Sequence, residues 1–119
     1  MPHFVIEYSE PAAPSTGFSE VFEALCEAAV GTGVMKREDI KLRAVPYRDF
    51  QLNDGSESFL HLTVSLLEGR TADQKEALGI ACRAVLVEHC PEIDAISVDI
   101  RDMHPQAYKK RVKQKAPQS

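Results

Sequence analysis

The clearest fold signal in the chain is FLHLTVSLLEGRTADQK, residues 59–75, which joins a strand pattern to a helix start. Apolar residues recur at every second position from Leu60 to Leu66, so one face of this segment is apolar and the other is mixed. Thr71 and Gln74 then fit a capping box, in which a hydroxyl and an amide satisfy backbone donors of a first helical turn. The pattern predicts a strand over 59–67 and a helix that begins after Thr71.

The helix that follows is expected to stop before Pro91, because proline cannot continue the hydrogen-bond ladder of a helix. A further strand is expected over 95–101, with its isoleucines and Val98 facing inward. Helical spacing assigns six apolar residues to the buried stripe of the helix: Ala77, Leu78, Ala81, Cys82, Val85 and Leu86.

The first half of the chain has the same pattern. Residues 3–9 alternate as a strand whose apolar face includes Phe4, and Pro2 has the parity of that face. A helix is expected from about Ser19 to the glycines near position 31. Residues 40–45 alternate again, which leaves Lys41 and Arg43 side by side on the face turned away from the helices. Pro46 should then end regular pairing or place this strand at a sheet edge.

The two halves repeat at an offset of about 55 residues, since Phe4 and Phe59 begin corresponding strands and Ile40 and Ile96 lie in corresponding second strands. We therefore predict an α+β fold built from a tandem β-α-β repeat, with two helices on one face of a four-stranded sheet. Each unit's own strands should be parallel. Ferredoxin-like folds share this element order, so the order alone does not assign a function.

Composition predicts one domain over residues 1–119, with repeat one at about 2–50, repeat two at about 57–105 and a basic tail at about 106–119. A hydrophobic share of 44% and a charged share of 27% are typical of soluble globular proteins. The sequence contains neither an apolar run long enough for a bilayer nor a signal-peptide pattern, so we predict a cytoplasmic protein without a membrane partner. Three cysteines without C-x-x-C spacing predict neither disulfides nor a metal site.

Charge is unevenly distributed along the chain. The net charge is −4, yet residues 109–115 hold five of the fourteen basic residues and no acidic ones. A basic tail can bind nucleic acid, but here it lacks interleaved aromatics and any recognisable module. We expect a solvated or subunit-docking tail and no nucleic-acid partner.

Residues 66–75 resemble the short tautomerases of the 4-oxalocrotonate type, in which a Leu-Glu-Gly-Arg run, a hydroxyl N-cap and a Gln-Lys pair follow a strand. The first half resembles the two-repeat members of that superfamily, the 5-carboxymethyl-2-hydroxymuconate isomerases, whose chains begin with Met-Pro-His-Phe or similar. Further matches to these two-repeat members lie at residues 29–34, Ile40 with Arg43, Asp54-Gly55 and residues 59–63. The resemblance covers nearly the whole chain.

This resemblance implies a homotrimeric isomerase whose cofactor-free site lies near Pro2 after removal of Met1. It implies that the Pro2 nitrogen is the general base, that Arg70 matches the family's loop arginine as a catalytic residue, and that the substrate is an unsaturated (di)carboxylate such as 5-carboxymethyl-2-hydroxymuconate. The family's strand arginine falls at Lys41, with Arg43 two residues on. Lysine offers a point charge where arginine offers a planar fork, so either residue remains a candidate for carboxylate binding.

Elementary electrostatics agrees with a proline base. A general base works best with a pKa near the working pH, and an α-amino group starts at roughly 7.7–8.0. One cation about 6 Å away, at an effective dielectric near 20, disfavours the protonated amine by roughly 2–3 kcal/mol. The same cations are therefore expected to bind a dianionic substrate and to keep Pro2 unprotonated.

Each candidate also has a simpler interpretation. The alternative for Arg70 is a surface residue near a helix start. For Lys41 and Arg43 it is a role in salt bridges of a subunit interface. His61 is most readily a hydrogen-bonded sheet histidine, and His3 points to the face opposite Pro2, which favours a structural role. The competing function is a non-enzymatic trimeric module or a ferredoxin-like binding or regulatory domain, in which Pro2 has no chemical role.

Overall fold

The computed structural model describes residues 2–14 and 17–114, so Met1 and the last five residues of the predicted basic tail lie outside the described part. The described elements follow the predicted β-α-β, β-α-β order, with two short 3₁₀ turns added. They are β1 His3–Ser9, η1 Glu10–Ala12, α1 Phe18–Gly31, η2 Arg37–Asp39, β2 Lys41–Tyr47, β3 Phe59–Leu67, α2 Ala72–His89 and β4 Ala95–Met103.

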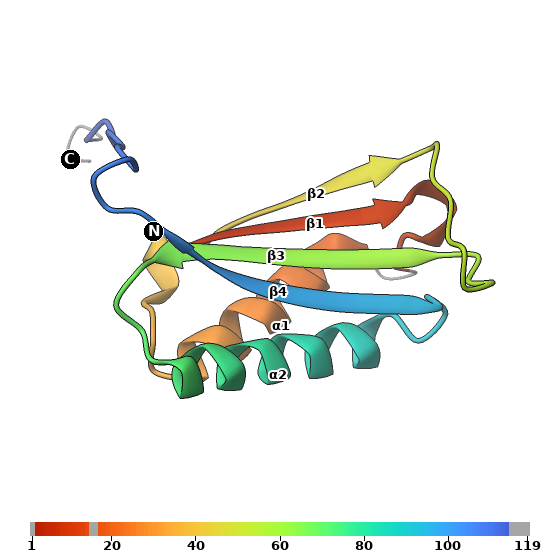
Figure 1. Ribbon diagram of the computed structural model, residues 1–119, viewed down its shortest axis with the longest axis horizontal. Helices are drawn as coiled ribbons and strands as arrows, with labels where there is room; N and C mark the ends of the chain where they lie inside the picture. The colour runs from red at the N-terminus through yellow and green to blue at the C-terminus, as the bar shows by residue number, and fades with distance from the viewer. Residues whose placement is uncertain (1, 15–16, 115–119) are drawn as a thin grey trace, which may run out of the picture.

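The four strands form one sheet in the order β2-β1-β3-β4 (Figure 1). β1 is parallel to β2 and β3 is parallel to β4, while the two units meet through the antiparallel pair β1 and β3. The two strands of each unit are direct neighbours, as a right-handed crossover requires. In the split units of ferredoxin-like folds another strand lies between them, so the ferredoxin-like alternative is wrong for this chain.

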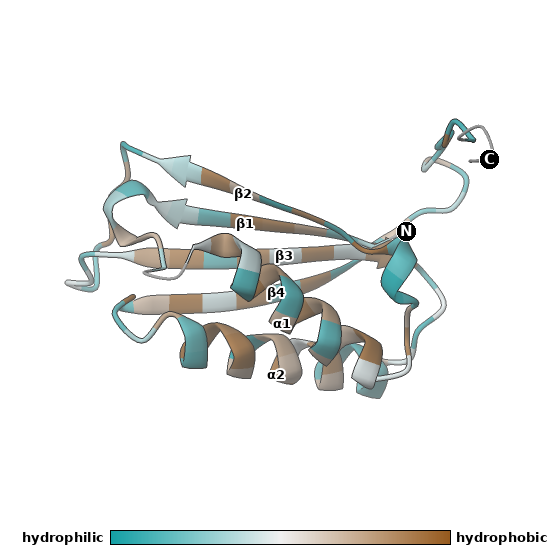
Figure 2. Ribbon diagram, turned by 180° about the vertical axis from the view of Figure 1, so that it is seen from behind, coloured by the Kyte–Doolittle hydropathy of each residue, from teal (hydrophilic) through white to brown (hydrophobic). Residues whose placement is uncertain are grey.

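Both helices cover the same face of the sheet, which confirms the predicted two-layer α+β fold (Figure 1). Figure 2 shows hydrophobic and hydrophilic segments alternating along both helices, as expected when one side of each packs on the sheet. The core between the layers is contributed by every second strand residue and by one stripe of each helix. Its fully buried members include Phe4, Ile6, Val21, Leu25, Ala29, Leu60, Leu62, Val64, Leu66, Leu78, Cys82 and Leu86.

β2 is an edge strand, which confirms the second of the two alternatives predicted for Pro46. The strand continues through Pro46, which stands opposite Tyr8 in the register, because a missing ladder donor can face outward at an edge. Ala77 was predicted in the buried stripe of α2, but it is exposed, since the helix turns its Leu78, Cys82 and Leu86 face toward the sheet. The stripe is therefore narrower than the spacing of apolar residues suggested.

The start of α2 is fixed as predicted. The Thr71 hydroxyl accepts from the Gln74 amide at 3.1 Å, and the Gln74 side chain accepts from the Thr71 amide at 2.8 Å. This reciprocal pair is the capping box expected from the sequence. The three cysteines are free and buried, as expected for reduced core thiols.

Among the described residues, no helix has the length and apolar character required to cross a membrane.

Candidate active site

Pro2 lies at the end of the sheet where β1 and β2 begin and β3 and β4 finish, here called the Pro2 end. Its carbonyl accepts a hydrogen bond from the Lys41 backbone amide at 3.0 Å, and less than 2% of its side chain is exposed. The ends of β3 and β4 are joined nearby by the bond from the Glu68 amide to the Met103 carbonyl, at 3.2 Å. Backbone pairing on both sides therefore holds the start of β1 in place.

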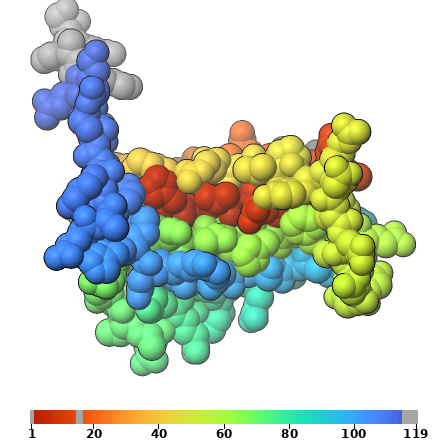
Figure 3. All heavy atoms as spheres, turned by 45° about the horizontal axis from the view of Figure 1, so that its top comes forward, coloured from red at the N-terminus to blue at the C-terminus, as the bar shows by residue number. Residues whose placement is uncertain are grey.

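Lys41 and Arg43 lie on the sheet face that the helices leave open, as their alternation predicted. In the register Lys41 stands beside His3, and Arg43 stands beside Val5. The Arg43 Nη1 lies 3.1 Å from His3 Nδ1, while the Lys41 Nζ donates to the Asp39 carbonyl at 3.3 Å. Figure 3 shows this open face, with side chains of all four strands exposed next to one another.

His3 sits between these cations. Burial lowers the pKa of the His3 imidazole, and the positive charges of Arg43 and then Lys41 lower it further. The ring is therefore held in its neutral form at neutral pH. His3 is on the open face. This was predicted, because the side chains of the adjacent residues Pro2 and His3 point to opposite faces of the sheet.

Arg70 is half-buried and joins two loops at the Pro2 end. Its Nη1 donates to the Leu67 carbonyl at 2.9 Å, and its Nη2 donates to the Val34 carbonyl at 2.7 Å. It thus ties the loop after β3 to the loop before β2, which corrects its interpretation as a simple surface residue. A guanidinium carries five N–H donors, so these two bonds leave three for another acceptor.

The structure brings the four predicted site residues to one end of the sheet, on different sides of it. Pro2 has the core-facing parity of Phe4, whereas Lys41 and Arg43 face the open side. The catalytic and binding roles of all four residues stay predictions.

Tyr108 is a site neighbour that sequence reasoning missed. Its hydroxyl lies 3.0 Å from His3 Nε2, and the two rings meet edge to face with centroids 5.8 Å apart. The two residues are 105 positions apart in the chain, so no local pattern indicates the contact.

Arg101 is a second residue of the open face that the sequence analysis did not name. It pairs in register with Ser65, the β3 neighbour of His3, and its charge is matched by Asp99, whose Oδ2 lies 2.6 Å from Arg101 Nε. This local ion pair leaves Lys41 and Arg43 as the cations of the open face that no carboxylate binds within the described part of the chain.

His61 is a sheet histidine, as expected. Its Nδ1 lies 2.6 Å from the Ser97 hydroxyl on the neighbouring strand. Farther along the open face, Phe59 packs edge to face against Tyr47 and Phe50, at centroid distances of 6.1 and 5.4 Å. This aromatic group lies at the opposite end of the strands from Pro2.

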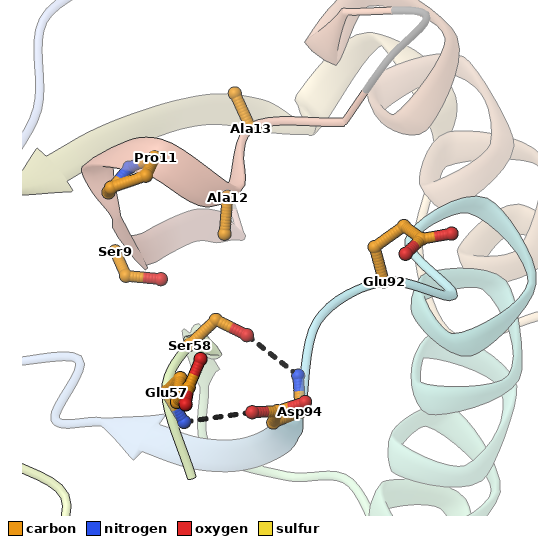
Figure 4. Close-up of a pocket in the computed structure, with 8 residues that line it drawn as sticks. All are labelled: Ser9, Pro11, Ala12, Ala13, Glu57, Ser58, Glu92 and Asp94. Carbon is orange, nitrogen blue, oxygen red and sulfur yellow. Dashed lines mark hydrogen bonds between the residues drawn. The ribbon is translucent and has the colours of Figure 1, made fainter.

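A cavity of about 410 Å³ opens at that opposite end (Figure 4). It is lined by Ser9, the last residue of β1, and by the acidic residues Glu57, Glu92 and Asp94. Asp94 is already bonded there, because its carboxylate accepts from the Glu57 amide and its own amide donates to the Ser58 hydroxyl. The acidic lining disfavours a dicarboxylate, so this cavity is not the predicted site.

Comparison with known proteins identifies the family of this chain. The family model described as 5-carboxymethyl-2-hydroxymuconate isomerase matches residues 2–115. The chain is 22% identical over 112 residues to the 5-carboxymethyl-2-hydroxymuconate Delta-isomerase of Escherichia coli, covering 88% of this chain and 89% of that protein.

Solved structures share the fold. A 5-carboxymethyl-2-hydroxymuconate isomerase from Deinococcus radiodurans R1 superposes with a TM-score of 0.80 at 24% identity, covering 94% of this chain and 90% of that one. The symmetric trimer of a fused 4-OT superposes with a TM-score of 0.74 at 19% identity, covering 86% and 85%. The predictions of a tautomerase-like fold and of an isomerase are thereby confirmed. The chain belongs to the 5-carboxymethyl-2-hydroxymuconate isomerase family.

Proposed function

We propose that this isomerase moves a proton within an unsaturated polycarboxylate such as 5-carboxymethyl-2-hydroxymuconate, with the Pro2 nitrogen as general base once Met1 has been removed. The observation that carries the proposal is the position of Pro2. It is buried at the start of β1, at the same end of the sheet as Lys41, Arg43 and Arg70.

Burial and charge both favour the neutral amine that a base must be. A processed Pro2 is a secondary amine whose ring has little freedom, because the Lys41 amide and the core side of β1 hold it. Desolvation disfavours a cationic ammonium, and nearby cations disfavour it further. Retention of Met1 would convert the nitrogen into a tertiary amide without basicity, so removal of Met1 is essential to the proposal.

The cations supply the binding energy. A charged hydrogen bond to a carboxylate contributes about 1.5–3 kcal/mol. Arg70 retains unused donors beside its two carbonyl bonds, and Arg43 presents a guanidinium at the open face. Two such groups at one end of the sheet can bind two carboxylates of the substrate.

The proposed reaction moves one proton from one atom of the substrate to another and needs no other reactant. The Pro2 nitrogen takes the proton from the enol hydroxyl or the α carbon, and its electron pair delocalises into a dienolate. The cations stabilise the negative charge that moves toward the carboxylates. The protonated Pro2 then returns the proton at a distant carbon of the conjugated system, so the amine is regenerated and no co-reactant is consumed.

We also propose a homotrimer. The open sheet face exposes the apolar side chains of Val45, Tyr47 and Phe50, and both β2 and β4 are edge strands. Exposed apolar surface and unpaired edges favour association. Light scattering after gel filtration should give three times the 13.2 kDa chain mass, and a monomer mass at micromolar concentration would overturn this assignment.

The base is tested by comparing two forms of one chain. Intact mass spectrometry separates protein with and without Met1, and methionine aminopeptidase converts the first form into the second. Ketonisation of 2-hydroxymuconate, followed by absorbance, should scale with the fraction that lacks Met1 and should fall at least 100-fold in the unprocessed form.

Two substitutions complete this test. Pro2→Ala should lower kcat, whereas Pro46→Ala, a change at the edge-strand proline, should leave it near the wild-type value. Equal activity of processed and unprocessed protein, or unchanged activity of Pro2→Ala, contradicts the role of Pro2.

A further inference from the structure

Three side chains from distant parts of the chain form a hydrogen-bond series on the open face at the Pro2 end. Arg43 Nη1 lies 3.1 Å from His3 Nδ1, and His3 Nε2 lies 3.0 Å from the Tyr108 hydroxyl. They come from β2, β1 and the segment that follows β4. The series therefore links the C-terminal segment to one of the two strand cations.

The donors and acceptors of this series have only one consistent assignment. A guanidinium donates and never accepts, so His3 Nδ1 must present its lone pair to Arg43. A neutral imidazole then carries its hydrogen on Nε2, which donates to the Tyr108 oxygen. The tautomer with hydrogen on Nδ1 would point N–H groups at each other and lose the bond to Arg43.

We infer that His3 and Tyr108 are positioning residues that orient Arg43 as the carboxylate-binding cation of the second strand. The inference rests on the proposed function for the identity of the ligand. Arg43 selects the Nε2–H tautomer of His3, Tyr108 holds the ring in place through its bond to Nε2, and His3 in turn fixes one arm of the Arg43 guanidinium.

This assignment gives the two strand cations, Lys41 and Arg43, different roles. The Lys41 ammonium donates to the Asp39 carbonyl and is a single point charge, whereas Arg43 keeps four of its five N–H donors after its bond to His3. A planar fork held at one arm suits bidentate binding of a carboxylate better than an ammonium does. An unrestrained arginine on an edge strand would lose more side-chain freedom on binding.

The tautomer is measured directly, without any turnover. Nitrogen-15 shifts of the His3 ring in the full chain should show the Nε2–H form in wild type and a mixture of tautomers in Arg43→Ala, which removes the donor that requires the Nδ1 lone pair. The matched control is Tyr47→Phe, which removes the hydroxyl of a tyrosine four residues beyond Arg43 on the same strand, where its partner is Glu7. It should leave the His3 tautomer unchanged. A predominant Nδ1–H form in wild type overturns the inference.

Ligand binding tests the consequence for Arg43. Calorimetry with cis,cis-muconate, an unsaturated dicarboxylate without the hydroxyl needed for tautomerisation, should give a Kd raised about tenfold in His3→Ala and about three- to tenfold in Tyr108→Phe. His3→Asn places an acceptor oxygen near the Nδ1 position and should restore Kd to within about threefold of wild type.

The outcomes are distinct from those that test Pro2. Loss of turnover with muconate affinity that still depends on His3 would refute the Pro2 base and leave the positioning role standing. Equal Kd values for wild type, His3→Ala and Tyr108→Phe would overturn the positioning role, as would the absence of muconate binding by wild type. Circular dichroism checks that His3→Ala folds, and Tyr108→Phe, altered outside the core, provides the second independent variant.

Discussion

Replacement of Arg70 by alanine should destabilise the fold as well as impair substrate binding. The side chain makes two charged hydrogen bonds, to the carbonyls of Leu67 and Val34, and thereby joins loops that lie 36 residues apart. Bonds of this type contribute about 1.5–3 kcal/mol each when buried. Because the guanidinium is only half-buried, solvent screening reduces the pair to about 2 kcal/mol in total.

The assay is urea unfolding at a fixed protein concentration, since subunit association makes apparent stability depend on concentration. With a slope of about 2 kcal/mol per molar urea, a loss of about 2 kcal/mol moves the midpoint down by about 1 M. Arg70→Lys should recover about half of the loss, because an ammonium keeps the charge but cannot span both carbonyls.

Arg83→Ala is the matched control, since Arg83 is exposed on α2. Its midpoint should lie within about 0.25 M of wild type, the equivalent of the usual 0.5 kcal/mol limit for surface changes. If Arg70→Ala unfolds at the same urea concentration as wild type, the two carbonyl bonds do not stabilise the loops.

A second measurement on the same variants separates structure from function. At a temperature where every variant is folded, kcat/KM of Arg70→Ala should fall about 10- to 100-fold if Arg70 also binds substrate. A midpoint shift without any change in kcat/KM would assign Arg70 to the loops alone.

Three further predictions concern other parts of the molecule. Thr71→Ala should lower the free energy of unfolding by about 1 kcal/mol through loss of the capping box, and Thr71→Ser should retain it, as denaturant midpoints will show; equal midpoints for both variants would contradict the cap. Burial raises the pKa of Cys82 to about 12, so its thiol should resist alkylation in the native state and react only on unfolding, as peptide mass mapping will show. The pKa of His3 is lowered from 6.5 in the folded state, so the unfolded chain binds more protons just below that value. The free energy of unfolding should therefore decrease as pH falls through this window, and this decrease should be smaller in His3→Asn; identical pH profiles would exclude His3 as its source.

The pH prediction depends on every group that surrounds His3. Lys41 and Arg43 face it from β2, the uncharged Ser65 faces it from β3, and Tyr108 faces it from the C-terminal segment. Comparison with His3→Asn isolates the imidazole, because that variant keeps all four of these neighbours.

The strands were predictable because their side chains alternate with a period of two. β3 has the predicted bounds, 59–67, since Leu60, Leu62, Val64 and Leu66 face the helices and the residues between them face away. Parity also placed Lys41 and Arg43 on the open face. Ala77 was misplaced because a small apolar residue beside the stripe has the same spacing whether or not the helix rotates it toward the sheet.

Contacts across the fold could not be predicted in the same way. The Val34 carbonyl that accepts from Arg70 has no side-chain signature, and the meeting of the two loops depends on where both helices end. The pairing of Tyr108 with His3 likewise depends on the strand order, which places β3 between β1 and β4. Sequence periodicity determines which face a residue occupies, whereas tertiary packing determines which partners it meets there.

The tandem repeat does not make the two ends of the sheet alike. Pro2 corresponds to Glu57 at the repeat offset of about 55, and the antiparallel pairing of β1 with β3 places these two positions at opposite ends of the sheet. One end gathers Lys41, Arg43, Arg70 and the basic segment that follows Tyr108, while the other gathers Glu57, Glu92 and Asp94. The two ends therefore present different side chains, although the same β-α-β unit is used twice to build the sheet.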